Sequence, residues 1–173
     1  MGNENQWHWQ EPGTAWKGVG IYHVTLVVPS RKPLLGKLMI PDNDPTKAVV
    51  ELSPLGFQVK NCVDEIPVRH SEIRIIQLRM MPNHVHVILY VTQSMNISIK
   101  KVVQGFWQGV KKIEREDEAT SVCPHTMRDN KRCSQIFTEM PFIRPLSRKG
   151  QLKTMIRYVQ LNPQRLATMI LKP

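Results

Sequence analysis

Two histidines separated by a single residue are the clearest candidates for metal chemistry in this chain. His84 and His86 lie in the stretch MMPNHVHVILY, residues 80–90, directly after the turn signal Pro82-Asn83. The residues that follow are β-branched, aliphatic or aromatic, which predicts a strand. Side chains alternate faces along a strand, so both imidazoles share one face, about 6.6 Å apart. Two imidazoles on one face can hold one metal ion. The alternative is two solvent-facing histidines on an edge strand, but a pair at this spacing within an otherwise apolar strand favours the metal site.

A tyrosine and an asparagine near the C-terminus supply a second candidate pair. Tyr158 and Asn162 are four residues apart, and a helix predicted over 149–161 would place them on one face. With the two histidines, the Asn162 carboxamide could hold a divalent cation on a phosphate oxygen while Tyr158 attacks the phosphorus. Arg157 or Arg165 would stabilise the phenolate and the transition-state charge. Spacing supports equally well a packed helix tyrosine and an asparagine that caps the helix.

Composition favours a nucleic-acid partner. The chain has 173 residues, 41% of them hydrophobic, which suits one globular domain. Its net charge of +10 suggests a polyanion, with nucleic acid as the first candidate and an anionic membrane as the second. No strongly basic amphipathic helix, bilayer-spanning apolar run or secretory signal is apparent, so we expect no membrane and a cytoplasmic location.

Two irregular segments flank the predicted elements. Residues 1–17 form an arm whose tryptophans could stack on unpaired bases or pack back on the domain. Residues 118–134 are predicted as an irregular basic insertion. Within it, Cys123, His125 and Cys133 could be soft zinc ligands, but a fourth ligand is missing, which favours free thiols in a loop. Three cysteines in all fit a reducing compartment rather than a disulfide framework.

The elements that must position the histidines form an antiparallel sheet. A strand over 19–28 carries His23 on one face and Tyr22 on the other, and we expect His23 to be structural or to support the metal ligands. A strand over 72–81 joins the paired-histidine strand through a tight turn, which predicts a hairpin with the histidine strand inside the sheet. Further predicted elements are short strands at Lys37–Ile40, 47–53 and 135–146, and helices over 55–66 (closed by Pro67), 96–117 and 149–161.

Three stretches resemble a known family. MMPNHVHVILY resembles the His-hydrophobe-His signature of the HUH endonucleases, and IRYVQLNPQRLA resembles the tyrosine helix of the single-tyrosine HUH transposases, written Y-x-x-x-N-P-x-R-A. GIYHVTL resembles their first strand. The resemblance is to the REP-associated tyrosine transposases and their insertion-sequence relatives, and it spans roughly residues 18–168. The segment MPFIRPLSRKG, residues 140–150, departs from the His-Asp-rich stretch usual in the family.

The resemblance implies a fold, a reaction and a partner. It implies an α+β, ferredoxin-like fold with a central antiparallel sheet and helices packed on its faces, and from the length of the chain we expect one domain over residues 1–173. It implies Mg²⁺ or Mn²⁺ held by His84 and His86, with Asn162 as third ligand. Tyr158 would then cleave single-stranded DNA, leaving a 5′-phosphotyrosine and a free 3′-OH. The expected partner is single-stranded or hairpin DNA, and many members are dimers, which leaves room for a homodimer.

Basic side chains provide candidate DNA contacts. Positive charge recurs along the helix predicted over 96–117, which suits phosphate contacts as well as an ordinary solvated face. The candidates are Lys100, Lys101, Lys111, Lys112, Arg128, Lys131, Arg132, Arg157 and Arg165. Two other functions stay open at this point. One is a domesticated nucleic-acid-binding protein without strand transfer, and the other is an unrelated HxH metal hydrolase that activates water and forms no covalent DNA adduct.

Overall fold

Four antiparallel strands form the central sheet. A computed structural model describes residues 16–120, 137 and 141–172. The strands are β1 (Gly20–Val27), β4 (Ile73–Met81), β5 (His84–Val91) and β6 (Phe142–Pro145). They are arranged in the order β4-β5-β1-β6, so β1 and β5 are interior. With a helical crossover after β1 and another after β5, this is the ferredoxin-like arrangement, which confirms the predicted α+β fold.

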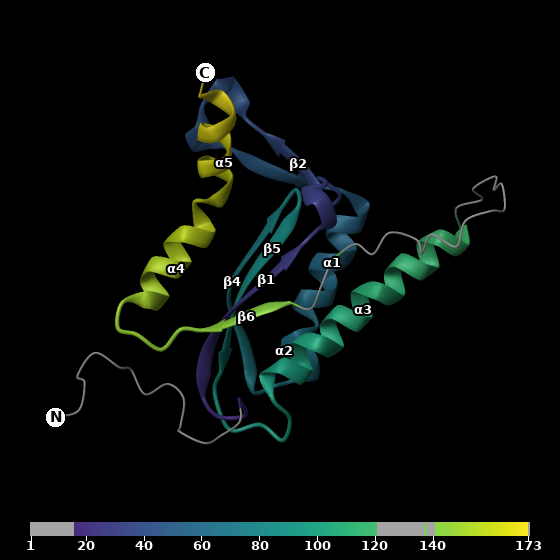
Figure 1. Ribbon diagram of the computed structural model, residues 1–173, viewed down its shortest axis with the longest axis vertical. Helices are drawn as coiled ribbons and strands as arrows, with labels where there is room; N and C mark the ends of the chain where they lie inside the picture. Colours follow the sequence, from purple (N-terminus) through teal and green to yellow (C-terminus); the bar gives the residue numbers. More distant parts are fainter. Residues whose placement is uncertain (1–15, 121–136, 138–140, 173) are drawn as a thin grey trace.

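Helices cover both faces of this sheet (Figure 1). On one face lie α1 (Pro54–Asp64) and α3 (Ile99–Thr120), and on the other lies α4 (Gln151–Gln160). The α1/α3 face is the main apolar core. Its fully buried members include Val24, Leu26, Val85, Val87 and Leu89. A smaller cluster, made of Ile21, Ile88, Leu146 and Val159, packs beneath α4. This division follows from the alternation of side chains along β1 and β5.

A second, two-stranded sheet lies beside the first. It pairs β2 (Gly36–Met39) with β3 (Val49–Leu52). Helix α5 (Asn162–Leu171) packs against this part of the chain, on the 3-10 turn Pro45–Lys47. The strands predicted at Lys37–Ile40 and 47–53 are therefore present, each slightly displaced or shortened.

Several predicted boundaries are wrong at their ends. The helix predicted to close at Pro67 instead ends at Asp64, and Pro67 lies in the first turn of a second short helix, α2 (Ile66–Arg69). Proline is tolerated there because the first-turn N–H groups lack intrahelical partners.

After α4 the chain enters α5, a helix that sequence patterning did not predict. The strand predicted over 135–146 is observed only at Phe142–Pro145.

The irregular segments are only partly described. Helix α3 begins after Ser98, whose hydroxyl accepts from the Lys101 N–H at 3.4 Å, and it continues to Thr120. Residues 118–120 are therefore helical, whereas 121–134 lie outside the described residues together with the candidate zinc ligands Cys123, His125 and Cys133.

Trp16, at the end of the N-terminal arm, packs on the domain. Its ring stacks on Tyr22 at 5.5 Å between centroids, and its carbonyl accepts from the Ile99 N–H at 2.9 Å. This end of the arm packs back on the domain, while residues 1–15 are outside the described ranges. Within the ranges that are described, no helix has both the length and the apolar character needed to span a bilayer.

Candidate active site

The two histidines of β5 lie on the sheet face that α4 covers. His86 pairs in register with Thr25 of β1, and the neighbouring Val85 and Val87 point into the α1/α3 core. Because β5 is hydrogen-bonded on both sides, its register and the direction of each side chain are fixed. His86 is 5% exposed, so its imidazole is buried within this face rather than displayed at an edge. His86 is therefore an interior residue, whereas His84 is half-buried and lines a surface pocket.

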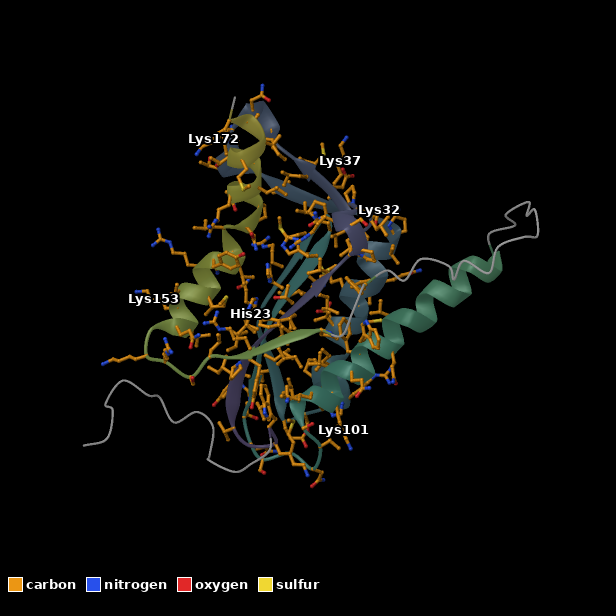
Figure 2. The ribbon with its side chains drawn as sticks, viewed as in Figure 1. His23, Lys32, Lys37, Lys101, Lys153 and Lys172 are labelled. Atoms are coloured by element: carbon orange, nitrogen blue, oxygen red, sulfur yellow. The ribbon has the colours of Figure 1, made fainter. Side chains whose placement is uncertain are left out.

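His86 is oriented by two neighbours on β1. Its Nδ1 lies 3.0 Å from Nε2 of His23 and 3.2 Å from Oγ1 of Thr25. When His86 Nδ1–H donates to either neighbour, the lone pair on Nε2 is left for a ligand. His23 was predicted to be structural or to support the metal ligands. It lies beside His86 on the neighbouring strand and projects from the sheet toward α4 (Figure 2).

His84 is oriented by the turn residue before it. Its Nδ1–H donates to Oδ1 of Asn83 at 2.6 Å, and Asn83 Nδ2 in turn donates to the Arg31 carbonyl at 3.1 Å. This chain of contacts leaves Nε2 of His84 available. The His84 and His86 rings are 4.8 Å apart between centroids and nearly perpendicular, at 82°. Both rings are thus held with one nitrogen occupied by the protein and the other free.

The surroundings keep all three imidazoles neutral. The pKa of His84 is lowered to about 4, mainly by burial and then by the charge of Arg31. The pKa of His86 is lowered to about 3, mainly by burial and then by its two histidine neighbours and Arg31. Burial, followed by the charge of Arg144, also lowers the pKa of His23. A neutral imidazole is the form that binds a metal ion.

Tyr158 approaches the histidines from α4. Its ring meets that of His86 edge-on, at 5.6 Å between centroids and 72° between planes. The guanidinium carbon of Arg165 lies 5.0 Å from the centre of the Tyr158 ring. The tyrosine is 37% exposed, so it is not a packed core aromatic, and its side chain is open to a ligand.

One pocket of about 240 Å³ connects these groups. It is lined by Arg31, Met81, Asn83, His84, Tyr158, Asn162, Arg165, Leu166 and Met169. Asn162 therefore lies on the same pocket as His84 and Tyr158, and Tyr158 contacts His86 from it. The two arginines make the pocket electropositive, which suits a phosphate group. We call this the histidine pocket.

The route by which Tyr158 and Asn162 meet differs from the prediction. They do not share one helix, because α4 ends at Gln160 and Asn162 is the first residue of α5. Leu161 takes up a φ of −86° and a ψ of 4° between the two helices. Pro163, which has no N–H to donate, is accommodated in the first turn of α5. Both side chains line the histidine pocket across this helix break.

The donor set fits a divalent cation. No three His, Cys, Asp or Glu side chains converge on a point in the described part of the chain, so a third protein ligand has to be of another type. Asn162 is the candidate for this position: its Nδ2 is buried and, within the described residues, has no hydrogen-bond partner. The two ends of a carboxamide are exchanged by a simple flip, so its oxygen can occupy the same position. Two neutral imidazoles and one amide oxygen suit a divalent metal ion.

The predicted DNA-contact residues are spread over the molecule. Arg165 lines the histidine pocket, whereas Arg157 is exposed on α4 and lines neither this pocket nor its neighbour at the start of α4. Lys100 lies 4.2 Å from the Trp16 ring centre, and Lys101 lines a separate groove between α2 and α3, across the sheet from the histidines. The side chains of Lys111, Lys112, Arg128, Lys131 and Arg132 lie outside the described residues.

Three residues of the site were not predicted. Thr25 could have been found, because it shares a strand face with His23 two residues away. Asn83 was expected only to form the turn, although its side chain orients His84. Arg31 carried no sequence signal, since it reaches the site through a turn in which Ser30 and Arg31 both have positive φ, 52° and 56°.

Comparison by sequence gives only a partial match. No protein-family model matches the chain. A curated relative, an uncharacterized protein of Haemophilus influenzae, is 27% identical over 78 residues, which is 45% of this chain and 39% of the relative. The chain thus matches well under half of that relative's length.

Two solved structures share the fold. The structure of a REP-associated tyrosine transposase bound to a REP hairpin has a TM-score of 0.55 and 12% identity, and covers 91% of this chain and 74% of that one. A candidate transposase from Deinococcus radiodurans R1 has a TM-score of 0.50 and 12% identity. The match covers 87% of this chain and 96% of that one. The chain has the fold of transposases.

Proposed function

We propose that this protein is a metal-dependent endonuclease and strand transferase for single-stranded DNA, a single-tyrosine transposase of the HUH type. One observation carries the proposal. Tyr158 stands edge-on to His86 at 5.6 Å, on a pocket that it shares with His84 and Asn162. Tyrosine is a weak nucleophile, and a neighbouring cation-binding site is what makes it effective toward phosphorus.

The reaction is a transesterification. The Tyr158 hydroxyl gives its proton to solvent and its oxygen attacks the phosphorus of one phosphodiester. The bond from phosphorus to the 3′ oxygen breaks, and that oxygen takes up a proton. The products are a 5′-phosphotyrosine and a free 3′-OH. Because one phosphate ester replaces another, a 3′-OH can reverse the step and join strands without a separate energy source.

The surrounding side chains stabilise the charge that develops. Arg165 lies over the Tyr158 ring and favours the phenolate, and Arg31 lines the same pocket, where the phosphate would be bound. His84, His86 and Asn162 would hold Mg²⁺ or Mn²⁺, which when bound polarises a non-bridging phosphate oxygen. His23, Thr25 and Asn83 keep the two imidazoles in the required orientation.

The test is the covalent adduct. The full chain is incubated with Mn²⁺ and end-labelled DNA hairpins whose loops and 5′ flanks are randomised, so that no target sequence has to be guessed. We expect a metal-dependent band of reduced mobility on a denaturing gel, absent in Tyr158→Phe and in His86→Ala. Tyr90→Phe is the matched control, since Tyr90 lies four residues beyond His86 on the same strand, and it should keep the band.

Two other outcomes would overturn the proposal. Metal-dependent cleavage that survives in Tyr158→Phe, with no covalent band, would identify a hydrolase that activates water. Tight hairpin binding with neither cleavage nor adduct across the randomised pool would identify a nucleic-acid-binding protein without strand transfer.

A further inference from the structure

A second, strongly basic pocket lies on the other side of Tyr158, between β6 and the start of α4. It has a volume of about 480 Å³ and is lined by Arg144, Arg148, Lys149, Gly150, Gln151, Thr154, Met155 and Tyr158. No acidic side chain lines it, and within the described ranges none of its three cations forms an ion pair. Three uncompensated cations in one concave site are an anion-binding arrangement. We call this the β6–α4 pocket.

Tyr158 connects this pocket to the histidine pocket. Its side chain lines both, so the two pockets flank the same ring. Arg144 of β6 pairs in register with His23 of β1, and His23 in turn contacts His86 at 3.0 Å. A ligand that extends from one pocket to the other therefore passes over the proposed nucleophile.

An exposed aromatic side chain lies on the same strand. Phe142 is two residues before Arg144 on β6 and pairs in register with Thr25, so it faces the α4 side of the sheet beside the histidines. It is 65% exposed. An exposed ring beside clustered cations is the combination with which proteins bind single-stranded nucleic acid, because every base has a face that can stack.

The start of α4 opens into the same pocket. Gly150, with a φ of 79°, turns the chain into α4, and a Cβ at this position would meet no atom within 4 Å. The first turn of the helix contains no acidic residue. The positive end of the helix dipole thus adds to the charge of the three side chains.

We propose that the β6–α4 pocket binds the nucleotide next to the cleaved phosphodiester on the same single strand, with Arg144, Arg148 and Lys149 on its phosphate and Phe142 stacked on its base. The position of this nucleotide next to the cleaved phosphodiester rests on the proposed function. The binding of a single strand by the pocket does not depend on it. The segment MPFIRPLSRKG, which departs from the family pattern, would then be the part of this chain that holds the DNA strand beside Tyr158.

The pocket is tested by binding, without cleavage. Fluorescein-labelled oligo-dT of about twelve nucleotides is titrated with the full chain in EDTA at several salt concentrations. We expect Arg144→Ala and Arg148→Ala each to weaken binding about five-fold and to lower the slope of log affinity against log salt by about 0.7 for each phosphate that is no longer neutralised. Lys153→Ala is the matched control. Lys153 is exposed on α4 (Figure 2) and is not among the residues that line the pocket, so its replacement should change affinity less than about two-fold.

The aromatic residue separates single-strand binding from general charge attraction. Phe142→Ala should weaken oligo-dT binding about five-fold or more, Phe142→Trp should restore it, and neither should change the affinity for a duplex. Equal losses of affinity for single strand and duplex, or no loss at all, would overturn the role of Phe142. A loss of affinity in Lys153→Ala as large as that in Arg144→Ala would show diffuse attraction and overturn the pocket.

The adduct assay separates this inference from the proposed function. Selective loss of oligo-dT binding in these variants, with no adduct from the unmodified chain, would support the pocket as a single-strand site and overturn nicking. An adduct from the unmodified chain, with unchanged binding and adduct yield in Arg144→Ala and Phe142→Ala, would support nicking and overturn the pocket.

Discussion

The two faces of the central sheet bury different kinds of side chain. Toward α1 and α3, strands β1 and β5 present an unbroken apolar surface, with Val24, Val85 and Leu89 all at most 1% exposed. Toward α4 the same two strands present His23 and His86, which are 6% and 5% exposed. Alternation along a strand allows one element to serve both purposes.

The difference shows where the free energy of folding comes from. The α1/α3 face buries apolar area, which is the main favourable contribution to folding. The α4 face buries a smaller apolar cluster and, beside it, imidazoles that have to stay neutral, and burying polar groups costs free energy unless they are hydrogen-bonded. We therefore expect substitutions on the first face to change stability and substitutions on the second to change chemistry.

Tyr158→Phe is expected to have the largest effect, and only on chemistry. Removing one hydroxyl should lower the yield of covalent adduct by about 10⁴-fold, because the attacking atom is gone. The free energy of unfolding should change by less than about 0.5 kcal/mol, since the ring is 37% exposed and its packing is retained. Adduct gels and urea denaturation on the same preparation check both numbers. A fall in stability comparable to that of a core variant would make Tyr158 a structural residue.

Leu89→Ala should have the opposite signature. Leu89 is 0% exposed on the α1/α3 face, so truncation should lower the free energy of unfolding by about 2–5 kcal/mol. Below the new melting temperature, Mn²⁺ affinity and adduct formation should stay within about two-fold of the unmodified chain. Urea denaturation with a matched metal titration measures this. A large fall in metal affinity in the folded variant would mean that the two faces are not independent.

This division is also where prediction from sequence succeeded and failed. Alternation within 19–28 and after Pro82-Asn83 predicted both faces and the hairpin, because a buried strand in a fixed register leaves little freedom. The spacing of Tyr158 and Asn162 predicted that the two side chains lie close together, and both line the histidine pocket, but they lie on two helices, because α4 ends before Leu161 and α5 begins after it.

The parts that could not be predicted depend on tertiary placement. Arg31 reaches the histidine pocket through a turn with positive φ values, which no residue type there demands. Arg144 meets His23 only because β6 pairs with β1, across more than one hundred residues of chain. Local propensity contains no information on such contacts, whereas the patterning of a single strand contains a good deal.

The pH dependence of stability should come from the α4 face. In the metal-free protein with a chelator, the unfolded histidines titrate near 6.5, but His84 and His86 do so at about 4 and about 3. Between 6.5 and about 4 the unfolded chain binds more protons, so the free energy of unfolding falls as the pH falls through this window. We expect a decrease of about 3 kcal/mol by the middle of the window, because both histidines contribute.

Thermal denaturation across this pH range provides the check. The double variant His84→Gln, His86→Gln should flatten the slope, whereas His70→Gln, on the groove between α2 and α3, should leave it in place. A melting temperature that is constant from 6.5 down to about 4 in the unmodified, metal-free chain would contradict buried neutral imidazoles on this face.

The smallest effect expected is that of His23, which acts through His86. In His23→Phe, Nδ1 of His86 loses its partner at 3.0 Å, and Mn²⁺ affinity should fall about ten-fold, since such supporting contacts orient a metal-binding imidazole. His23→Gln, whose carbonyl can still accept the hydrogen bond, should recover most of the affinity. A purely structural role for His23 would lower the melting temperature in both variants and leave metal affinity in the folded protein unchanged.

Thr25 offers a second acceptor for His86 Nδ1–H, at 3.2 Å. Adding Thr25→Val to His23→Phe should therefore weaken metal binding further, whereas Thr25→Val alone should leave metal affinity nearly unchanged.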